Sequence, residues 1–535
     1  EVVRVLAVEI KLSPLIVQKK QYNRGFLYFL LKKCLIRSLL CSADAIKKRR
    51  SLQPVFPNLQ DWAVSNIGRF QSRRAMPELL NLLRDIRAAV WGFPLLGMLG
   101  VVGVYLSVKL RFLQFRFLLD SLRMTFLGDR GTAAKSSAQQ KAGDISNFQA
   151  LMTSLAAAIG TGNIAGVATA IAVGGLGSLF WMWVMAFLGM VIKYAEALLA
   201  VKYRVQNSEG QYVGGPMYYL FRGCCSKPLA YTYAGFGVFA CIGTGNLIQS
   251  NSVADAMQSS FGISNWMTGT ALLVLVGFVI LGGVQRIGRL AEKVVPAMSL
   301  LYVLWGCGVL VQNSGQILPT FARIFSEAFG YDAMLGGVWG GGVALALREG
   351  FARGVLSNEA GLGTSAIASA AAITDHPGRP AMIAMTSVFL STIVVCTLTG
   401  LVIGVSGVLG PVAGDVSSAL TGAPLAIAAF NKIPYGELVV TSGLALFALT
   451  TIIGWAYYGE KMTEFLLGRK GIPIFRLIYL IGIWWGARLD LELAWTLADI
   501  FNAFMVLPNL IGILMLTRVV RSETDQFIQL RMKER

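Results

Sequence analysis

Charged residues are scarce in this sequence. Asp, Glu, Lys and Arg make up 14% of its 535 residues, whereas a soluble globular domain carries about 25%. Hydrophobic residues make up 55%, and many occur in runs of about 20, the length that a membrane-spanning helix needs. The composition therefore excludes an ordinary soluble domain and predicts an all-α polytopic membrane protein.

The residue types on which most enzymes and metal sites depend are scarce as well. His376 is the only histidine, and none of the seven cysteines forms a CxxC pair, which argues against a His- or Cys-based metal site. The sequence contains no phosphate-binding P-loop and no nucleophile elbow. We therefore expect neither an enzyme nor an ATP-driven pump, and no bound cofactor.

The net charge of +19 is unevenly distributed. Residues 1–75 carry 15 basic and 4 acidic residues, and most of the remaining excess lies in short loops between apolar runs. Because no basic groove with interleaved aromatics appears, we expect no nucleic-acid partner. We expect residues 1–75 to be a non-native upstream extension or a disordered basic tail, or alternatively a basic arm on the membrane surface. The coherent pattern begins at Met76.

Eleven apolar segments follow Met76. They run approximately over 88–108, 145–172, 179–201, 231–252, 265–283, 294–312, 337–372, 381–404, 437–458, 475–487 and 494–516. The first belongs to an N-terminal region, 76–144, with a basic loop. The other ten divide five plus five into the halves 145–312 and 337–516, and a tail follows at 517–535. Lys and Arg gather in alternate loops, so the positive-inside rule places the C-terminus in the cytoplasm of a multi-pass plasma-membrane (bacterial inner-membrane) protein.

The centre of the segment 145–172 reads Gly160-Thr161-Gly162-Asn163. Two glycines around a β-branched residue disfavour a continuous helix. A spanning helix can lose backbone hydrogen bonds only where protein or a water-filled cavity replaces them. Such a break exposes N–H groups that suit a carboxylate and C=O groups that suit a small cation. The alternative is that these glycines only allow two helices to pack closely.

The segment 337–372 is too long for one plain span. As a continuous helix it would measure about 54 Å against an apolar core of about 30 Å, so it must break, tilt or protrude. The sequence leaves two positions for a break, the cluster at Gly340 and the cluster at Gly361 and Gly363. Glycine-interrupted helices at matching positions of two inverted halves indicate a transporter site.

Charged residues within apolar segments need an explanation because burying them is costly. Lys193 and Glu196 lie three residues apart near the cytoplasmic end of 179–201, so we interpret them as a structural or snorkelling pair rather than a proton relay. Four charged residues of 337–372 form either gate ion pairs or a helix-stabilising cluster near the cytoplasmic face: Arg348, Glu349, Arg353 and Glu359.

Uncharged polar residues offer further candidates. Gln249 and Asn251 are suited to hydrogen-bond a substrate or to join helices, and we favour the first role for Gln249. Thr450 and Thr451 can complete an oxygen shell for Na⁺, which prefers hard ligands, or bond back to their own helix. Trp455, one turn beyond Thr451, covers a ligand or serves packing.

Longer motifs resemble the alanine or glycine:cation symporter family. They are Gly160-Thr-Gly-Asn-Ile-Ala-Gly-Val-Ala168, Phe180-Trp-Met-Trp-Val184, Gly189-Met-Val-Ile-Lys-Tyr-Ala-Glu196, Gly214-Gly-Pro-Met-Tyr-Tyr219, Ser357-Asn-Glu-Ala-Gly-Leu-Gly-Thr-Ser365 and Gly454-Trp-Ala-Tyr-Tyr-Gly-Glu460. The resemblance covers about residues 85–520. It implies a LeuT-like fold of two inverted five-helix repeats with one extra N-terminal helix. It also implies Na⁺-driven uptake of alanine or glycine by alternating access.

The resemblance also implies roles for individual residues. The backbone from Gly160 to Asn163 would hold the substrate carboxylate, with Gln249, Asn251, Thr451 and Trp455 lining the pocket. The coupling ion would lie near Ala157, Thr450 and Thr451. Independently of the resemblance, the residues themselves suggest a possible gate or break that involves Gly340, Arg353, Asn358, Glu359, Gly361 and Gly363.

Two other function classes fit the residues less well. A channel would need a continuous polar stripe, whereas this sequence has isolated polar points at helix breaks. A membrane enzyme would need a titratable constellation that is absent. The expected partners are therefore a small amino acid and the lipid bilayer. Na⁺ or H⁺ coupling, alanine or glycine preference and the oligomeric state stay open, and a monomer fits the sequence.

Overall fold

The computed structural model describes residues 75–127, 143–330, 341–409, 420–489 and 491–534. The predictions for residues 1–74 and for Gly340 fall outside these ranges. Residues 80–535 cluster as one unit, which is described here.

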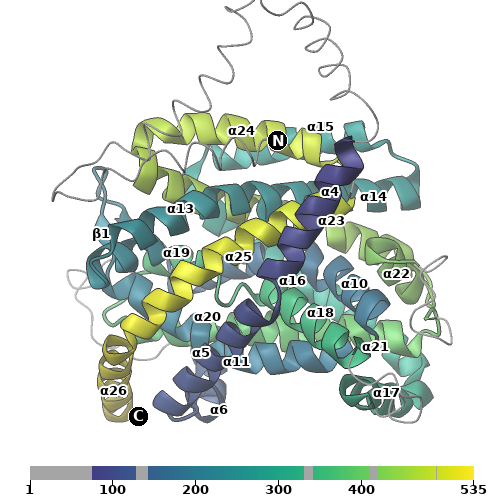
Figure 1. Ribbon diagram of the computed structural model, residues 1–535, viewed down its shortest axis with the longest axis horizontal. Coiled ribbons are helices and arrows are strands. Elements are labelled where there is room, and N and C mark those ends of the chain that lie inside the picture. Colours follow the sequence, from purple (N-terminus) through teal and green to yellow (C-terminus); the bar gives the residue numbers. More distant parts are fainter. Residues whose placement is uncertain (1–74, 128–142, 331–340, 410–419, 490, 535) are drawn as a thin grey trace, which may run out of the picture. The chain divides into compact units, whose positions relative to one another are not determined.

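Helices form almost all of the described chain (Figure 1). In order they are α4 (Ala75–Val90), α5 (Phe93–Lys109), α6 (Leu113–Arg116), α7 (Leu118–Phe126), α9 (Asn147–Ala158), η1 (Thr161–Asn163), α10 (Ala165–Gly174), α11 (Gly177–Lys202), α12 (Pro216–Tyr218), η2 (Tyr219–Gly223), α13 (Lys227–Ile242), η3 (Gly243–Leu247), α14 (Ile248–Phe261), α15 (Asn265–Ile280), α16 (Gly283–Gln312), η4 (Ser314–Gln316), α17 (Ile317–Phe329), α18 (Gly341–Asn358), α19 (Thr364–Ala370), α20 (Gly378–Val388), η6 (Phe389–Cys396), α21 (Thr397–Val405), α22 (Gly422–Phe430), α23 (Gly436–Leu467), η7 (Arg469–Gly471), α24 (Ile472–Gly486), α25 (Leu491–Met515) and α26 (Thr517–Glu534).

Long apolar helices give the membrane-spanning character. Within the described residues, six helices are long and apolar enough to cross a bilayer, and the bent pair α9–α10 brings the number to seven. The six are Leu80–Lys109, Gly177–Lys202, Gly283–Gln312, Gly378–Val405, Gly436–Leu467 and Glu492–Met515. The other four predicted segments contain shorter or interrupted helices, such as α15 and α24, so the total of eleven spans stays a prediction.

The first predicted break is present. α9 ends at Ala158 and α10 begins at Ala165, and the two helices are bent by 63° with one short turn, η1, between them. α9 starts with a capping box, in which the Ser146 hydroxyl accepts the Gln149 N–H and the Gln149 side chain accepts the Ser146 N–H. The start is thus fixed by its cap, and the end by the glycines of the sequence.

The second break lies at the Gly361–Gly363 cluster. α18 ends at Asn358 and α19 begins at Thr364. Glu359, Gly361 and Gly363 have φ angles of 58°, 89° and 74°, in the left-handed region that a helix cannot use. Glycine adopts this region freely, whereas for Glu359 it is strained. The structure therefore shows a break at one of the two positions that the sequence left open, whereas Gly340 lies outside the described residues.

The two broken helices meet with opposite orientation, as an inverted repeat requires. The start of α9 lies beside the end of α19: the Asp144 N–H donates to the Ala371 carbonyl, and the Ile373 N–H donates to the Ile145 carbonyl, each at 2.8 Å. A small hairpin, β1 (Val205–Gln206) paired antiparallel with β2 (Tyr212–Val213), joins here, because the Tyr212 N–H donates to the Asp144 carboxylate at 2.8 Å. Burial raises the pKa of this carboxyl above its ordinary value.

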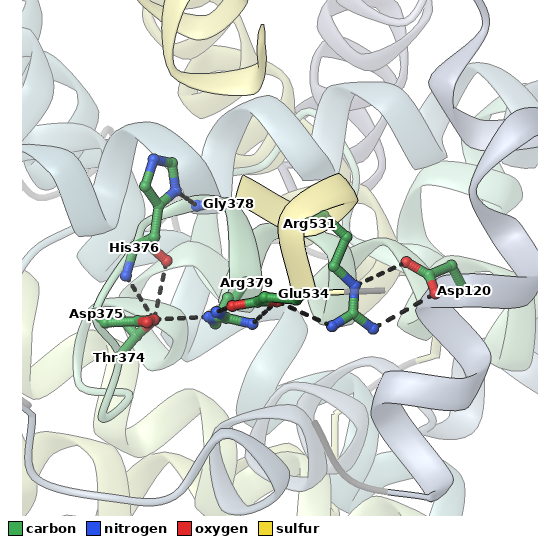
Figure 2. Close-up of polar contacts among 8 residues, drawn as sticks. All are labelled: Asp120, Thr374, Asp375, His376, Gly378, Arg379, Arg531 and Glu534. Carbon is green, nitrogen blue, oxygen red and sulfur yellow. Dashed lines mark hydrogen bonds and ion pairs between the residues drawn. The ribbon is translucent and has the colours of Figure 1, made fainter. Parts of the chain in front are cut away.

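A network of ion pairs holds the last helix, α26, on the fold (Figure 2). Arg379, 1% exposed at the start of α20, pairs with Asp375 at 2.7 Å and with Glu534 of α26. Arg531 of α26 pairs with Asp120 of α7 at 3.1 Å. Charged groups that are buried and paired in this way tie distant segments of the chain together.

Candidate transport site

The backbone N–H groups of the first break have side-chain partners. The Gly160 N–H donates to the Asn163 side-chain oxygen at 3.2 Å, and the Thr161 N–H donates to the Gln249 side-chain oxygen at 3.1 Å. All of these residues are buried. The break therefore presents polar groups at membrane depth, where they act far more strongly than in water.

Gly160 is the point at which three elements converge. A Cβ atom placed on it would lie 2.6 Å from the Thr451 hydroxyl of α23 and 2.9 Å from the Gln249 side-chain oxygen of α14. Both distances are shorter than a normal contact, so a glycine is required for the backbone to approach these groups. The predicted residues Gly160, Gln249 and Thr451 are thus brought together in space.

Carbonyl groups at the end of α9 face α23. The Thr451 hydroxyl lies 2.8 Å from the Ala156 carbonyl oxygen, to which it donates, and 3.4 Å from that of Ile159. These three oxygens come from one unwound helix end and one side chain. Such hard oxygen groups are the donors that a cation like Na⁺ prefers.

Two other predicted residues take different contacts near this point. The Trp455 indole N–H donates to the Ala157 carbonyl at 3.3 Å, so this carbonyl faces Trp455. The Thr450 hydroxyl donates to the Phe447 carbonyl of its own helix at 2.9 Å, which is the back-bonding alternative. Thr451 has the cross-helix contact and Thr450 does not.

Asn251 and Asn246 both contact the region of α24. The Asn251 amide donates to the Leu489 carbonyl at 2.7 Å, and the Asn246 amide donates to the Tyr479 carbonyl at 2.5 Å. Both contacts join helices, which is the alternative role that the sequence left open for Asn251. The role of Asn251 in substrate binding stays a prediction.

A polar bridge that the sequence analysis missed links the two breaks. The Asn163 amide donates to the Ser391 carbonyl of η6 at 3.0 Å and lies 3.4 Å from the Ser357 hydroxyl of α18. Ser357 in turn contacts the Thr392 hydroxyl of η6 at 2.7 Å. Hydroxyl residues within the apolar segment 381–404 were the available signal, because polar groups in a membrane helix need partners.

Ion pairs surround Arg353, one of the predicted gate residues. Its guanidinium lies 3.7 Å from Glu349 and 3.7 Å from Asp499 of α25, and 4.3 Å from the ring centre of Trp495. Arg87 also pairs with Asp499, at 2.7 Å. Arg353 is 2% exposed, so these contacts form a buried charge cluster toward the start of α18 and α25.

The second break is held by charged residues of α11. The Lys193 ammonium donates to the Asn358 carbonyl at 2.6 Å, and the Gly361 N–H donates to the Glu196 carboxylate at 2.9 Å. Lys193 and Glu196 have no exposed surface. The interpretation as a snorkelling pair near the membrane surface is therefore wrong, because both side chains turn inward to the broken backbone.

This geometry defines a class of protein. Two broken helices of opposite orientation meet at a buried polar centre in an apolar helical fold, which is the architecture of secondary transporters. In the structure of MhsT in complex with L-phenylalanine, the same fold recurs with a TM-score of 0.52 and 16% identity, over 72% of this chain and 92% of that one. The chain has the LeuT-like fold that its motifs imply.

The family follows from the sequence comparisons. Residues 76–535 match the model of the sodium:alanine symporter family, and the chain belongs to this family. The sodium/alanine symporter AgcS of Methanococcus maripaludis is 47% identical over 463 residues, which cover 85% of this chain and 99% of that protein. GlnT of Bacillus subtilis, a probable sodium/glutamine symporter, is 36% identical over 463 residues, covering 84% and 90%. The protein is thus a multi-pass membrane transporter for Na⁺-coupled amino-acid symport.

Proposed function

We propose that this protein takes up alanine, and also glycine, together with Na⁺ through the site at Gly160. The observation that carries the proposal is that three groups converge on Gly160. They are the broken end of α9, the Gln249 amide and the Thr451 hydroxyl. N–H groups on one side suit the substrate carboxylate, and carbonyl groups on the other suit a cation.

The ion and the substrate would share the break. The carbonyl oxygens of Ala156 and Ile159 and the Thr451 hydroxyl are the proposed Na⁺ ligands, with Ala157 and Thr450 beside them. The Gly160 and Thr161 N–H groups, with Gly162 and Asn163 completing the turn, are the proposed carboxylate site. Binding of a carboxylate there would require the Gln249 side chain to leave the Thr161 N–H, so substrate and Gln249 compete for one donor.

Close packing supports a small substrate side chain. A Cβ atom on Gly245 would lie 2.2 Å from Cβ of Trp455, and one on Gly454 would lie 2.9 Å from Cβ of Ala157. Little room is left around the break for a long side chain. The similarity to the sodium/alanine symporter AgcS supports the same choice.

The loop charges support an orientation of the protein in the membrane. Basic residues gather in the loops after α5, α11 and α23, and the positive-inside rule assigns these loops and the C-terminus to the cytoplasm. Under this orientation the cluster of Arg353 and Asp499 faces outward, not toward the cytoplasmic face that the sequence analysis considered, and is the proposed outer gate. The second break lies on its cytoplasmic side.

Uptake of labelled amino acid into proteoliposomes tests the proposal. An inward Na⁺ gradient is expected to drive accumulation of alanine, and excess unlabelled alanine or glycine to compete, with glutamine competing much less. Equal competition by glutamine would overturn the assignment of a small substrate. Alanine uptake that is the same with and without a Na⁺ gradient would overturn the coupling.

A further inference from the structure

A group of ionisable residues at the second break has no role in the site proposed above. Lys193 and Glu196 of α11 are fully buried, and Glu359, between α18 and α19, is 1% exposed. Charged side chains at membrane depth are costly and mark sites at which charge or protons are handled. We call these three residues the buried triad.

Hydrogen bonds distinguish the two carboxylates of the triad. One oxygen of Glu196 accepts from the Gly361 N–H at 2.9 Å and from the Asn509 amide at 2.7 Å. Glu359 accepts from the Thr364 hydroxyl at 3.0 Å, and the Trp455 side chain also interacts with its carboxylate. Hydrogen-bond donors stabilise the charged form of a carboxyl, so the backbone and amide donors favour Glu196 as the charged partner of Lys193.

Several buried polar atoms of this region have no hydrogen-bond partner within the described residues, and three of them bear on the triad. They are the second oxygens, Oε2 of Glu196 and Oε1 of Glu359, and the Tyr458 hydroxyl. An unpartnered carboxylate oxygen in the membrane interior carries a large cost, which protonation removes. The other titratable groups that face Glu359 are Lys193, Glu196, Tyr233, Cys241 and Tyr458, from α11, α13 and α23.

The formal charges of the buried triad indicate how many protons it must bind to be neutral. Lys193 contributes one positive charge, Glu196 and Glu359 contribute two negative charges, and the tyrosines and the cysteine are neutral at physiological pH. The triad therefore carries a net charge of −1 unless one proton binds. One proton on Glu359 makes the triad neutral, because the positive charge of Lys193 and the negative charge of Glu196 then cancel.

We propose that Glu359 Oε1 binds and releases one proton in each transport cycle. An O–H bond forms at Oε1 with the proton of a hydronium ion, which becomes water, and the reverse step returns the proton to water after the break has moved. The strained backbone of Glu359, at the joint between α18 and α19, makes the exposure of this carboxyl depend on the orientation of the two half-helices.

The position of Glu359 connects the proton to the substrate site. Trp455, whose indole contacts the Ala157 carbonyl of the first break, also borders Glu359. Only the Trp455 side chain thus lies between Glu359 and the proposed ion and substrate site, so a change of charge at Glu359 affects that site through Trp455. This coupling rests on the proposed alanine transport, whereas the presence of the proton does not.

Infrared spectroscopy of the purified full chain tests the proton site without transport. We expect the carbonyl stretch of a protonated carboxylic acid to appear and disappear as the pH is varied, and to be lost in Glu359→Gln. Glu359→Asp should keep the band at a shifted frequency. The control variant Glu492→Gln changes a half-exposed carboxyl paired with Arg84, and should retain the band. Absence of any titrating band in the wild type, or its loss in Glu196→Gln alone, would overturn the proposal.

Transport measurements give the second readout. At a fixed Na⁺ gradient, we measure the initial rate of alanine uptake as a function of pH. In the pH range in which protonation limits transport, the rate is expected to change by up to about tenfold per pH unit. In Glu359→Gln, the rate is expected to be nearly independent of pH. An unchanged pH profile in a folded Glu359→Gln protein would contradict the proposal. If the wild type shows the infrared band but no alanine uptake, the proposed substrate fails and the proton site stands.

Discussion

At the scale of single residues, the first break depends on the absence of a side chain at Gly160. The Thr451 hydroxyl and the Gln249 amide occupy the space in which a Cβ atom would lie. The proposed carboxylate site and the proposed ion site therefore meet at Gly160, which would connect the two ligands directly.

The variant Gly160→Ala tests this close approach. The added methyl group must displace Thr451 or Gln249, at a cost of about 1–3 kcal/mol for overpacking, and we expect alanine uptake to fall by at least about tenfold while the protein still folds. Gly100→Ala is the matched control, because a Cβ atom there has no neighbour within 4 Å. Normal uptake by Gly160→Ala would show that the substrate binds elsewhere.

The variant Thr451→Val removes one proposed Na⁺ ligand and keeps the side-chain shape. Loss of about 1.4 kcal/mol of ion binding raises the Na⁺ concentration for half-maximal uptake about tenfold. Thr450→Val provides the comparison, because its hydroxyl bonds to its own helix, and we expect a clearly smaller shift. The measurement is the Na⁺ dependence of the initial uptake rate, and equal shifts in both variants would refute the assignment of Thr451.

The sequence predicted the first break, but it did not predict which way the buried Lys193 side chain points. The Gly160–Asn163 motif predicted a break, because glycine and β-branched residues disfavour a helix wherever they occur. The inward direction of Lys193 was not predictable. Its partner, the Asn358 carbonyl, lies far away in sequence and becomes free only because α18 ends there.

At the scale of elements, α26 is fixed by ion pairs that span the chain. Arg379, Glu534, Arg531 and Asp120 form a continuous series of contacts in Figure 2, and Lys202 of α11 pairs with Glu523 of α26 at 2.7 Å. Because α11 also holds the second break, α26 is connected to that break through one helix.

Removal of Arg379 tests the strength of this attachment. Arg379→Ala leaves the carboxylates of Asp375 and Glu534 without their buried partner, so we expect a loss of about 2–3 kcal/mol in the free energy of unfolding. Arg521→Ala, on α26, is the control, since its pair with Asp525 is half-exposed and 3.8 Å long, and such pairs contribute at most about 1 kcal/mol. Thermal unfolding in detergent measures both, and equal effects would contradict the account.

His376 makes the stability of this region depend on pH. Burial lowers its pKa below the ordinary value, although Glu523 opposes the shift, and its Nδ1 atom accepts the Gly378 N–H at 3.0 Å. The folded protein thus binds the His376 proton less readily than the unfolded chain. Stability is full above about pH 6.5 and is lost as the pH falls toward the folded pKa. We expect His376→Gln to reduce this loss, as measured by unfolding temperatures between pH 7.5 and 5; an unchanged pH dependence would exclude His376 as its source.

Element boundaries were less predictable than element types. The sequence offered two glycine clusters for the second break, and both are equally poor helix formers. The choice of Gly361 and Gly363 depends on Glu196 and Asn509, which accept and donate hydrogen bonds at the broken backbone. Such partners belong to other helices, so a local sequence pattern does not reveal them.

At the scale of the whole molecule, the inverted relation of the two halves brings both breaks to one buried centre. The bridge from Asn163 through Ser357 to Thr392 connects them. Movement of one half relative to the other must therefore rearrange the substrate site, the ion site and the buried triad together. Coupled transport follows when none of these can rearrange alone.

Alanine-dependent entry of labelled Na⁺ tests the central claim most directly. Proteoliposomes with no initial Na⁺ gradient are given an inward alanine gradient, and Na⁺ uptake is followed. The shared break predicts that alanine drives Na⁺ inward against its own gradient, and that Gly160→Ala abolishes both fluxes together. Alanine entry without any movement of Na⁺ would contradict the account.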